Sequence, residues 1–259
     1  MSGYPHCITF TVPENLDLLT SDAGPRLLLA LAQEAGCLFG NTERYLANPR
    51  RPVANDLSAL SELWIASAST PAERVGAFFY MWLPEPYYLD VNITLDLVGR
   101  NHLWIGFSDN AFGGDDEWSK ARFEKLLQIC CITYRELQVV YGFGPLGIER
   151  YPLGWQPSLT EPDKLYDVNF FGRSVVDKLG RQVVLSVPAW RTELLEDGGA
   201  LVVMCDVPFR GSYTRKHIEE VVATAEQLGL KDQPGIRLML EQERKMAAAR
   251  HARSGGANP

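Results

Sequence analysis

The chain has 259 residues, of which 46% are hydrophobic and 22% charged, and its formal net charge is −7 at pH 7. This composition is ordinary for a globular protein and excludes global disorder. No long basic stripe is visible, which argues against nucleic acid as the main ligand, because phosphate binding relies on clustered Lys and Arg. The acidic balance better fits a protein partner with a basic surface.

The first ten residues, MSGYPHCITF, have neither the basic region nor the long apolar region of a secretion signal. No apolar stretch approaches the roughly 18 residues that a membrane span requires, so we expect no membrane association. The chain has five cysteines, and their odd number and unpaired spacing predict free thiols rather than a disulfide framework. These features together predict a cytoplasmic protein.

The chain opens with a predicted strand over 6–12, which is alternating and β-branched and ends at Pro13. An amphipathic helix is predicted over 22–38, with Asp22 as its N-cap and Pro25 in its first turn. The segment 40–56, with two prolines and three arginines, is typical of an exposed loop.

Aromatic and β-branched runs then predict β-structure over 62–68, 74–82, 88–97 and 101–108. The run 88–97 alternates apolar and polar residues over its whole length, which indicates a strand with one solvated face. Turn signals separate the last three runs, so we expect an antiparallel meander over about 74–108, packed on the helix that follows.

A helix over about 115–140 carries one apolar stripe from Phe123 to Leu137, and the Gly/Pro-rich segment 141–147 is expected to end it. Residues 148–165 look irregular. The C-terminal half then predicts a short helix over 172–179, a hairpin whose turn is Glu196–Gly199, and a helix over about 214–228.

The order of these elements predicts an α+β fold, in which an antiparallel sheet, made of the meander and the C-terminal hairpin, packs with helices on one side. We expect one domain over 1–230, because neither half alone supplies a complete core. Residues 231–259 form a charged tail, expected to be partly helical or disordered.

No complete catalytic or metal-binding motif is present. The glycines of 142–147 match the dinucleotide spacing GxGxxG, but they follow a helix and Pro145 removes an N–H, so a turn is the better interpretation. The four histidines are scattered, and His217 with the nearby Glu220 is interpreted as a surface pair. The sequence therefore predicts no catalytic residues, no metal site and no cofactor.

Two groups of residues could instead form a contact surface. Asp115, Asp116 and Glu117 begin a predicted helix, where the dipole favours negative charge, and they could also face a basic partner. Tyr87, Tyr88 and Phe112 lie at loops rather than in mid-strand, where aromatic side chains can anchor an interface. Core packing is the competing interpretation for the aromatic residues.

Residues 141–230 share a pattern of turn glycines, core aromatics and a closing helix: Asn169, Phe170, Phe171, Gly172, Leu179, Gly180, Pro188, Ala189, Trp190, Gly198, Gly199, His217, Leu228 and Gly229. In this pattern the C-terminal half resembles bacterial immunity proteins of polymorphic-toxin and type VI secretion systems. The resemblance implies a non-enzymatic protein that binds a cognate toxin and neutralises it by occlusion. It assigns no residue as a toxin contact.

Two alternatives remain open from the sequence. One is an enzyme whose site is assembled from scattered residues such as His102, Asp109 and Arg173. The other is a structural or scaffold module of a secretion or phage apparatus.

Overall fold

The computed structural model describes residues 6–18, 20–40, 52–68, 76–96, 102–107, 112, 117–144, 161–162, 165–206 and 215–230. In chain order, its helices and strands are β1 (His6–Thr11), α1 (Ala23–Ala35), β2 (Leu38–Gly40), α2 (Leu57–Ala68), β3 (Gly76–Leu83), β4 (Leu89–Asp96), β5 (His102–Phe107), α3 (Glu117–Leu137), β6 (Tyr141–Phe143), β7 (Val168–Phe171), α4 (Arg173–Leu179), α5 (Arg181–Leu185), β8 (Arg191–Leu194), β9 (Ala200–Val203) and α6 (Arg215–Gln227).

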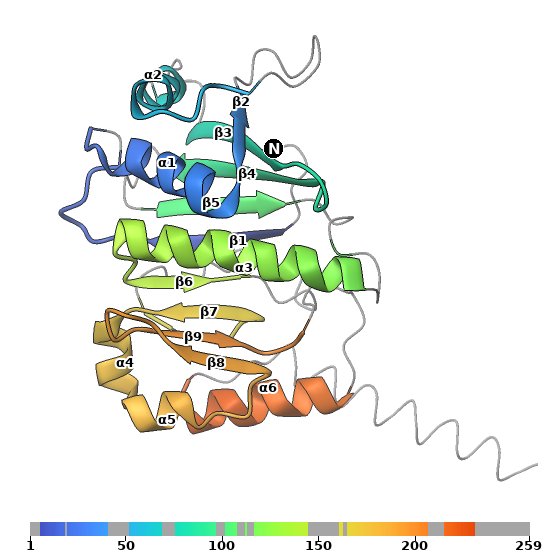
Figure 1. Ribbon diagram of the computed structural model, residues 1–259. Helices are drawn as coiled ribbons and strands as arrows, with labels where there is room; N and C mark the ends of the chain where they lie inside the picture. The colour runs from blue at the N-terminus through green and yellow to red at the C-terminus, as the bar shows by residue number, and fades with distance from the viewer. Residues whose placement is uncertain are drawn as a thin grey trace, which may run out of the picture.

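The strands described form one nine-stranded sheet in the order β2-β3-β4-β5-β1-β6-β7-β9-β8 (Figure 1). Every neighbouring pair in this sheet is antiparallel. The predicted α+β class is confirmed, as are the meander, now β3-β4-β5, and the C-terminal hairpin, now β8-β9. The first strand inserts between the meander and the second half of the sheet, with Ile8 opposite Ile105 of β5.

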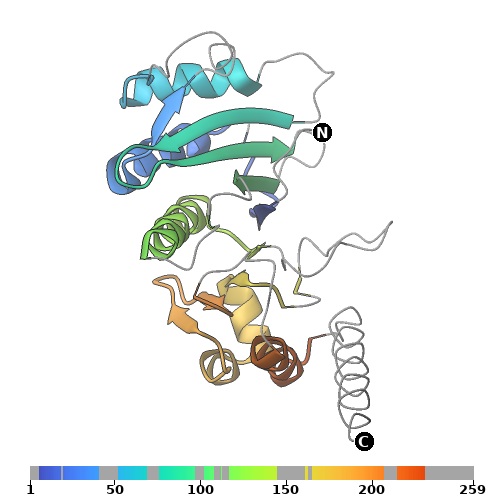
Figure 2. The same cartoon turned by 90° about the vertical axis from the view of Figure 1, so that its right-hand side faces the viewer.

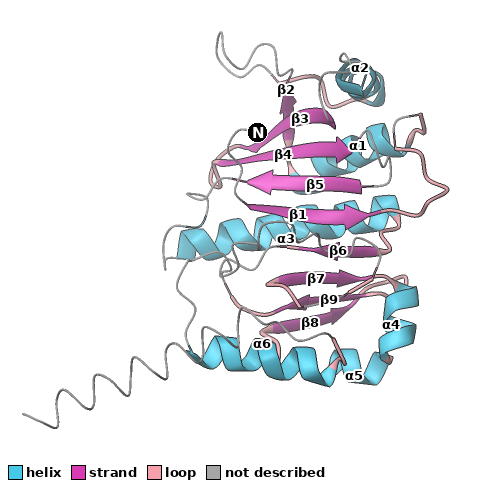
Figure 3. Ribbon diagram, turned by 180° about the vertical axis from the view of Figure 1, so that it is seen from behind, coloured by secondary structure: helices cyan, strands magenta, loops and turns pink. Residues whose placement is uncertain are grey.

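The sheet has two halves: the first consists of β1 to β5 and the second of β6 to β9. Different sets of helices cover opposite faces of the sheet in these two halves. Helices α1 and α3 lie over the strands from β3 to β6 in Figure 1, and Figure 3 shows those strands from behind with both helices on the far side. Helices α4, α5 and α6 pack against the other face at the β6–β9 end. Alternate residues of β9 follow this division. Leu201 and Val203 belong to the core that contains α1 and α3 (the first core), and Ala200 and Val202 to the core that contains α4, α5 and α6 (the second core). The expectation of helices on one side holds for the first half, whereas β7 and β9 are covered on both faces.

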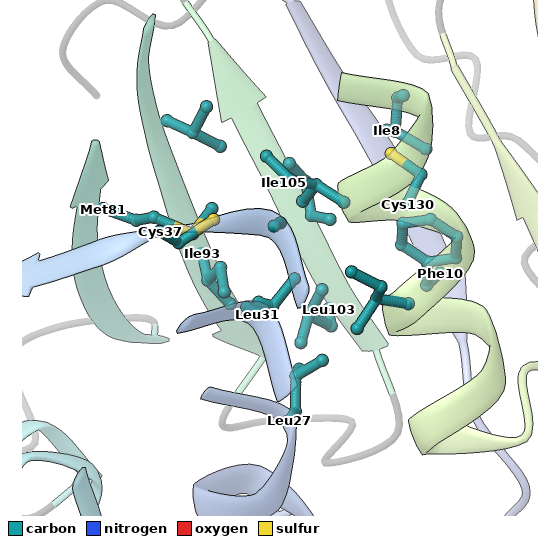
Figure 4. Close-up of a cluster of buried hydrophobic side chains, with 14 of the residues drawn as sticks. Ile8, Phe10, Leu27, Leu31, Cys37, Met81, Ile93, Leu103, Ile105 and Cys130 are labelled. Atoms are coloured by element: carbon teal, nitrogen blue, oxygen red, sulfur yellow. The ribbon is translucent and has the colours of Figure 1, made fainter. Parts of the chain in front are cut away.

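The first core is built from strand residues of the meander and β1 against α1 and α3. Figure 4 shows Leu27 and Leu31 of α1 beside Leu103 of β5, and Cys130 of α3 between Ile8 and Phe10 of β1. All of these side chains are fully buried. The apolar stripe predicted for the helix over 115–140, now α3, therefore packs as expected, and α1 covers the same face of the sheet.

The segment 62–68 is helical, so its prediction as a strand was wrong. It is the second half of α2, whose first turn is capped by Asp56 Oδ1, which accepts a hydrogen bond from the backbone N–H of Ala59 at 2.9 Å. Leu60, Leu63 and Trp64 are buried at helical spacing, which is the pattern that decides the structure here.

Two boundaries also differ from those predicted. Helix α1 ends at Ala35, three residues early, because Gly36 takes a left-handed conformation (φ 71°) and its N–H bonds back to Leu31. Residues 141–143, expected to lie in a helix-ending turn, form β6 near the middle of the sheet. Gly142 pairs with Phe10 of β1, and a Cβ on Gly142 would lie 2.7 Å from the Phe10 ring. Glycine therefore leaves the space that this ring occupies.

The other predicted helices are confirmed, namely 172–179 as α4 and 214–228 as α6, while β7 was not predicted. The tail 231–259 and most of the loop 40–56 lie outside the described residues. Among the residues described, no helix is both long and apolar enough to span a membrane.

Candidate functional site

The turn between β3 and β4 meets the first turns of α3 at one edge of the first half. The backbone N–H groups of Tyr87 and Tyr88 both reach the carbonyl of Pro84, at 3.0 and 3.2 Å, which closes the turn tightly. Tyr88 has φ of 44°, a left-handed conformation that is costly for a residue with a side chain and is often found at functional sites. The Tyr88 hydroxyl donates a hydrogen bond to the Glu85 carboxylate.

Arg122 of α3 holds this turn in place from below. Its Nε donates to the carbonyl of Tyr87, and its Nη2 donates to the carbonyl of Tyr88 at 2.6 Å. The residue is only 6% exposed, so a buried guanidinium fixes two successive carbonyls of the turn. The turn is therefore attached to α3 by charge-assisted hydrogen bonds.

Trp118 completes the arrangement from the first turn of α3. Its ring lies 3.3 Å from Arg122 Cζ, and its Nε1 donates to the carbonyl of Pro86 at 3.3 Å. Tyr87 is half-buried and carries Lys125 Nζ 5.4 Å from its ring centroid. We refer to Tyr87, Tyr88 and Trp118 as the aromatic surface.

The aromatic surface is exposed although its backbone is fixed. Tyr88 is 58% exposed and Trp118 is 44% exposed, which is unusual for large aromatic side chains. The Glu85 carboxylate lies at its rim, bound to the Tyr88 hydroxyl, and Glu85 is exposed. Large, rigid and exposed aromatic side chains are the residues that most often anchor protein interfaces.

Of the residues predicted as contacts, Tyr87 and Tyr88 lie together in this turn, and Glu117 is exposed at the start of α3, next to Trp118 in the chain. Phe112 does not join them at the surface, since it is 2% exposed and packs edge-on against Phe107 and Phe123 in the core. Asp115 and Asp116 lie outside the described residues. Trp118 was not among the predicted contacts, although an aromatic residue in an otherwise charged first helical turn was a usable signal.

A second feature lies at the other end of α3. A groove of about 400 Å³ runs between the C-terminal half of α3 and the β8-β9 hairpin, and four carboxylates line it: Glu34, Glu193, Glu196 and Asp197. Arg135 also lines it and is bound to Glu34, with Nη1 3.1 Å from Oε2. We refer to this feature as the acidic groove.

Two titratable groups of the acidic groove are held in their neutral forms. Burial raises the pKa of Cys131 to about 11, with the Glu193 carboxylate acting in the same direction. Burial also raises the pKa of Tyr134, and its hydroxyl donates a 2.7 Å hydrogen bond to Asp197 Oδ2 that acts in the same sense. Cys131 is therefore a poor nucleophile, and Tyr134 serves as a fixed donor to the hairpin turn.

His217 is not a surface residue paired with Glu220, as the sequence had suggested. It is 8% exposed, and its Nε2 lies 3.8 Å from Oδ1 of Asp167, which precedes β7 and is fully buried. Glu220 is instead 3.4 Å from Lys216 Nζ. The helical pairing rule identified the wrong partner, because the carboxylate comes from the residue just before β7, 50 residues earlier in the chain.

The residues of the alternative enzyme site are not brought together. His102 of β5 is buried, with its Nδ1 3.2 Å from Thr11 Oγ1 of the neighbouring strand. Arg173 is on the surface of α4, where its Nε lies 3.8 Å from Asp177. Strand β5 and helix α4 lie in opposite halves of the molecule in Figures 1 and 3, and Asp109 lies outside the described residues.

No protein-family model matches the chain. No curated protein matches it in sequence. Among solved structures, it is similar to "Pseudomonas aeruginosa T6SS protein PA0821", with a TM-score of 0.48 and 11% sequence identity, over 89% of this chain and 72% of that one.

Proposed function

We propose that this chain is a non-catalytic binding protein of the immunity type, which neutralises a cognate bacterial toxin by occlusion. The observation that carries the proposal is the aromatic surface, in which Tyr88 and Trp118 remain exposed while Arg122 fixes the backbone beneath them. Side chains that are already ordered lose less conformational entropy on binding, so they make effective anchors.

Charge supports a basic partner. The chain has 32 Asp and Glu against 25 Lys and Arg, and carboxylates stand both at the rim of the aromatic surface and in the acidic groove. Trp118 lies near the N-terminus of α3 and the acidic groove beside its C-terminal half, so each feature includes part of this helix. Complementary potentials of this kind raise the association rate and exclude partners of the wrong sign.

The resemblance of the C-terminal half to immunity proteins supplies the partner class. Such proteins act by covering the toxin, and binding over a surface requires no nucleophile or general base. This agrees with the position of His102 inside the sheet and with the raised pKa of Cys131.

The test begins with a search for a toxin gene beside this one and measures binding of its product to the full chain and its Tyr88→Ala and Trp118→Ala variants. We expect each substitution to weaken binding by about 30-fold, which corresponds to about 2 kcal/mol. Ile65→Ala is the matched control, because Ile65 is 62% exposed but lies on α2. Circular dichroism should show that all three variants remain folded.

Two outcomes, one from these variants and one from a further variant, His102→Ala, separate the alternatives. If both aromatic variants bind as tightly as the unsubstituted protein, the aromatic surface is not the interface. If His102→Ala removes protection of growth while fold and toxin binding stay intact, occlusion is wrong and an enzymatic role is the better account.

A further inference from the structure

Three side chains with different ligand atoms converge in the second half of the molecule. Asp167, Cys205 and His217 each offer one atom, and these three atoms all lie within 4.8 Å of one another. Asp167 is fully buried, His217 is 8% exposed and Cys205 is partly exposed. The cluster therefore has a buried side and an open side.

The fold positions this cluster through a strand pair and a helix. Val168 of β7 pairs with Val203 of β9, and the N–H of Met204 donates to the carbonyl of Asp167 at 2.8 Å. This pairing places Asp167 and Cys205 at adjacent strand ends. Helix α6 packs over that face through Ile218 and Val221, which belong to the second core, and so brings His217 to the same point.

We propose that Asp167, Cys205 and His217 form a Zn²⁺ site. A thiolate, an imidazole and a carboxylate are the three kinds of protein ligand that zinc takes, whereas Ca²⁺ and Mg²⁺ prefer sites built from oxygen alone. Two nitrogen or oxygen ligands of one tetrahedral zinc ion stand about 3.4 Å apart. The 3.8 Å between His217 Nε2 and Asp167 Oδ1 is within a few tenths of an ångström of that separation.

The geometry favours a metal over a Cys-His-Asp catalytic relay. In a relay, one imidazole nitrogen faces the nucleophile and the other faces the carboxylate, so the sulfur and the carboxylate lie on opposite sides of the ring. Here the sulfur, one imidazole nitrogen and one carboxylate oxygen surround a common point. The Nε2–Oδ1 distance is also longer than the roughly 2.8 Å of a charge-assisted hydrogen bond.

Three protein ligands leave one coordination position for water or another donor. A bound ion would join the end of β7, the end of β9 and α6 through bonds that the unfolded chain cannot form. Zinc binding at this site therefore stabilises the half of the molecule built from β6 to α6. This site is independent of the aromatic surface and of the toxin-binding proposal.

The experiment uses the full chain, purified under reducing conditions and stripped of metal by a chelator, then titrated with Co²⁺ and back-titrated with Zn²⁺. We expect one Co²⁺ per chain, with the visible bands of a tetrahedral ion and a near-ultraviolet band from the thiolate, both removed by one equivalent of Zn²⁺. Cys205→Ser should abolish the thiolate band. Cys205→Ser, His217→Gln and Asp167→Asn should each weaken binding by at least about tenfold.

Matched controls keep the test independent of folding. Cys131→Ser removes another partly exposed thiol and His102→Gln another buried imidazole, and both should bind Co²⁺ like the unsubstituted protein. Zn²⁺ should raise the melting temperature of the unsubstituted protein but not that of Cys205→Ser. A titration without a stoichiometric thiolate band, or one that Cys205→Ser leaves unchanged, overturns the proposal.

Discussion

At the scale of single residues, Trp64 links three elements of the first half. Its side chain is 1% exposed, stacks on Phe79 of β3 with ring centroids 4.5 Å apart, and donates from Nε1 to the carbonyl of Leu18 at 3.0 Å. A Cβ on Gly24, in the first turn of α1, would lie 2.1 Å from two atoms of the Trp64 ring. Gly24 therefore gives the ring the space that it needs.

We predict that Gly24→Ala destabilises the protein, although the same change in an open helix stabilises by up to about 1 kcal/mol. The added methyl group must displace a packed indole, so the expected loss in the free energy of unfolding is about 1–3 kcal/mol. Urea unfolding measures it, and the control is Gln33→Ala, at an exposed position of the same helix, which should be nearly neutral. A Gly24→Ala protein as stable as the unsubstituted one would show that the ring moves at no cost.

At the scale of elements, α2 depends on its first turn. The Asp56 carboxylate accepts a hydrogen bond from the Ala59 N–H, while Ile65 and Leu57 on the same helix are exposed. A helix of 12 residues with part of its apolar surface in solvent has limited packing to stabilise it. Capping is therefore a relatively large contribution here.

We predict that Asp56→Ala lowers the free energy of unfolding by about 1 kcal/mol, because the Ala59 N–H loses its acceptor. Asp56→Asn should retain most of the stability, since its amide oxygen can accept the same hydrogen bond. Hydrogen exchange at the amides of α2 distinguishes a local loss from a global one. Equal exchange in Asp56→Ala and Asp56→Asn would mean that the cap contributes little.

The elements also show how far the sequence determines the fold. The run 88–97 was predicted correctly because its alternation can only place apolar residues on one face of a strand. The run 62–68 was predicted wrongly as a strand because its composition suits a strand. The structure is helical because Leu60, Leu63 and Trp64 repeat at helical spacing. Strand β6 was missed because Gly142, which reads as a turn signal, is required there by the Phe10 ring.

The candidate site could be predicted only in part, because the sequence shows which residues are neighbours along the chain but not which ones meet through tertiary contacts. Tyr87 and Tyr88 are adjacent in a turn, so sequence alone places them together at a surface. Their attachment to α3 through Arg122 depends on tertiary contacts between residues 34 or 35 positions apart. The convergence of Asp167, Cys205 and His217 likewise follows from strand pairing and helix packing, which no local pattern encodes.

At the scale of the whole molecule, two cores share one sheet. In Figure 2, turned by a right angle from Figure 1, α1 and α3 lie to one side of the upper strands, and α5 and α6 lie at the bottom of the molecule. The first core does not stop at the middle of the sheet, since it includes Val168 and Phe170 of β7 and Leu201 and Val203 of β9. Phe170 contacts both Phe10 and Tyr134, at ring-centroid distances of 5.3 and 5.8 Å.

This overlap predicts that the two halves unfold together. Melting the second half would expose the faces of β7 and β9 that α3 covers and would break the hydrogen bonds between β6 and β1. The cost of that exposure couples the halves, so neither has a stable state alone. One domain over 1–230 would therefore mean that both halves unfold in a single cooperative transition.

We therefore predict that Val221→Ala, in α6 and buried only in the second core, raises the exchange rates of the slowest amides in β4 and in β9 by the same factor. The substitution deletes two buried methyl groups, and a loss of about 2 kcal/mol corresponds to about 30-fold faster exchange through global unfolding. Phe170→Ala removes the ring of β7 that contacts Phe10 and Tyr134. It should give a larger change in exchange rate, again equal in β4 and β9. Faster exchange in β9 with unchanged exchange in β4 would show that the second half opens by itself, and the chain would then have two folding units along one sheet.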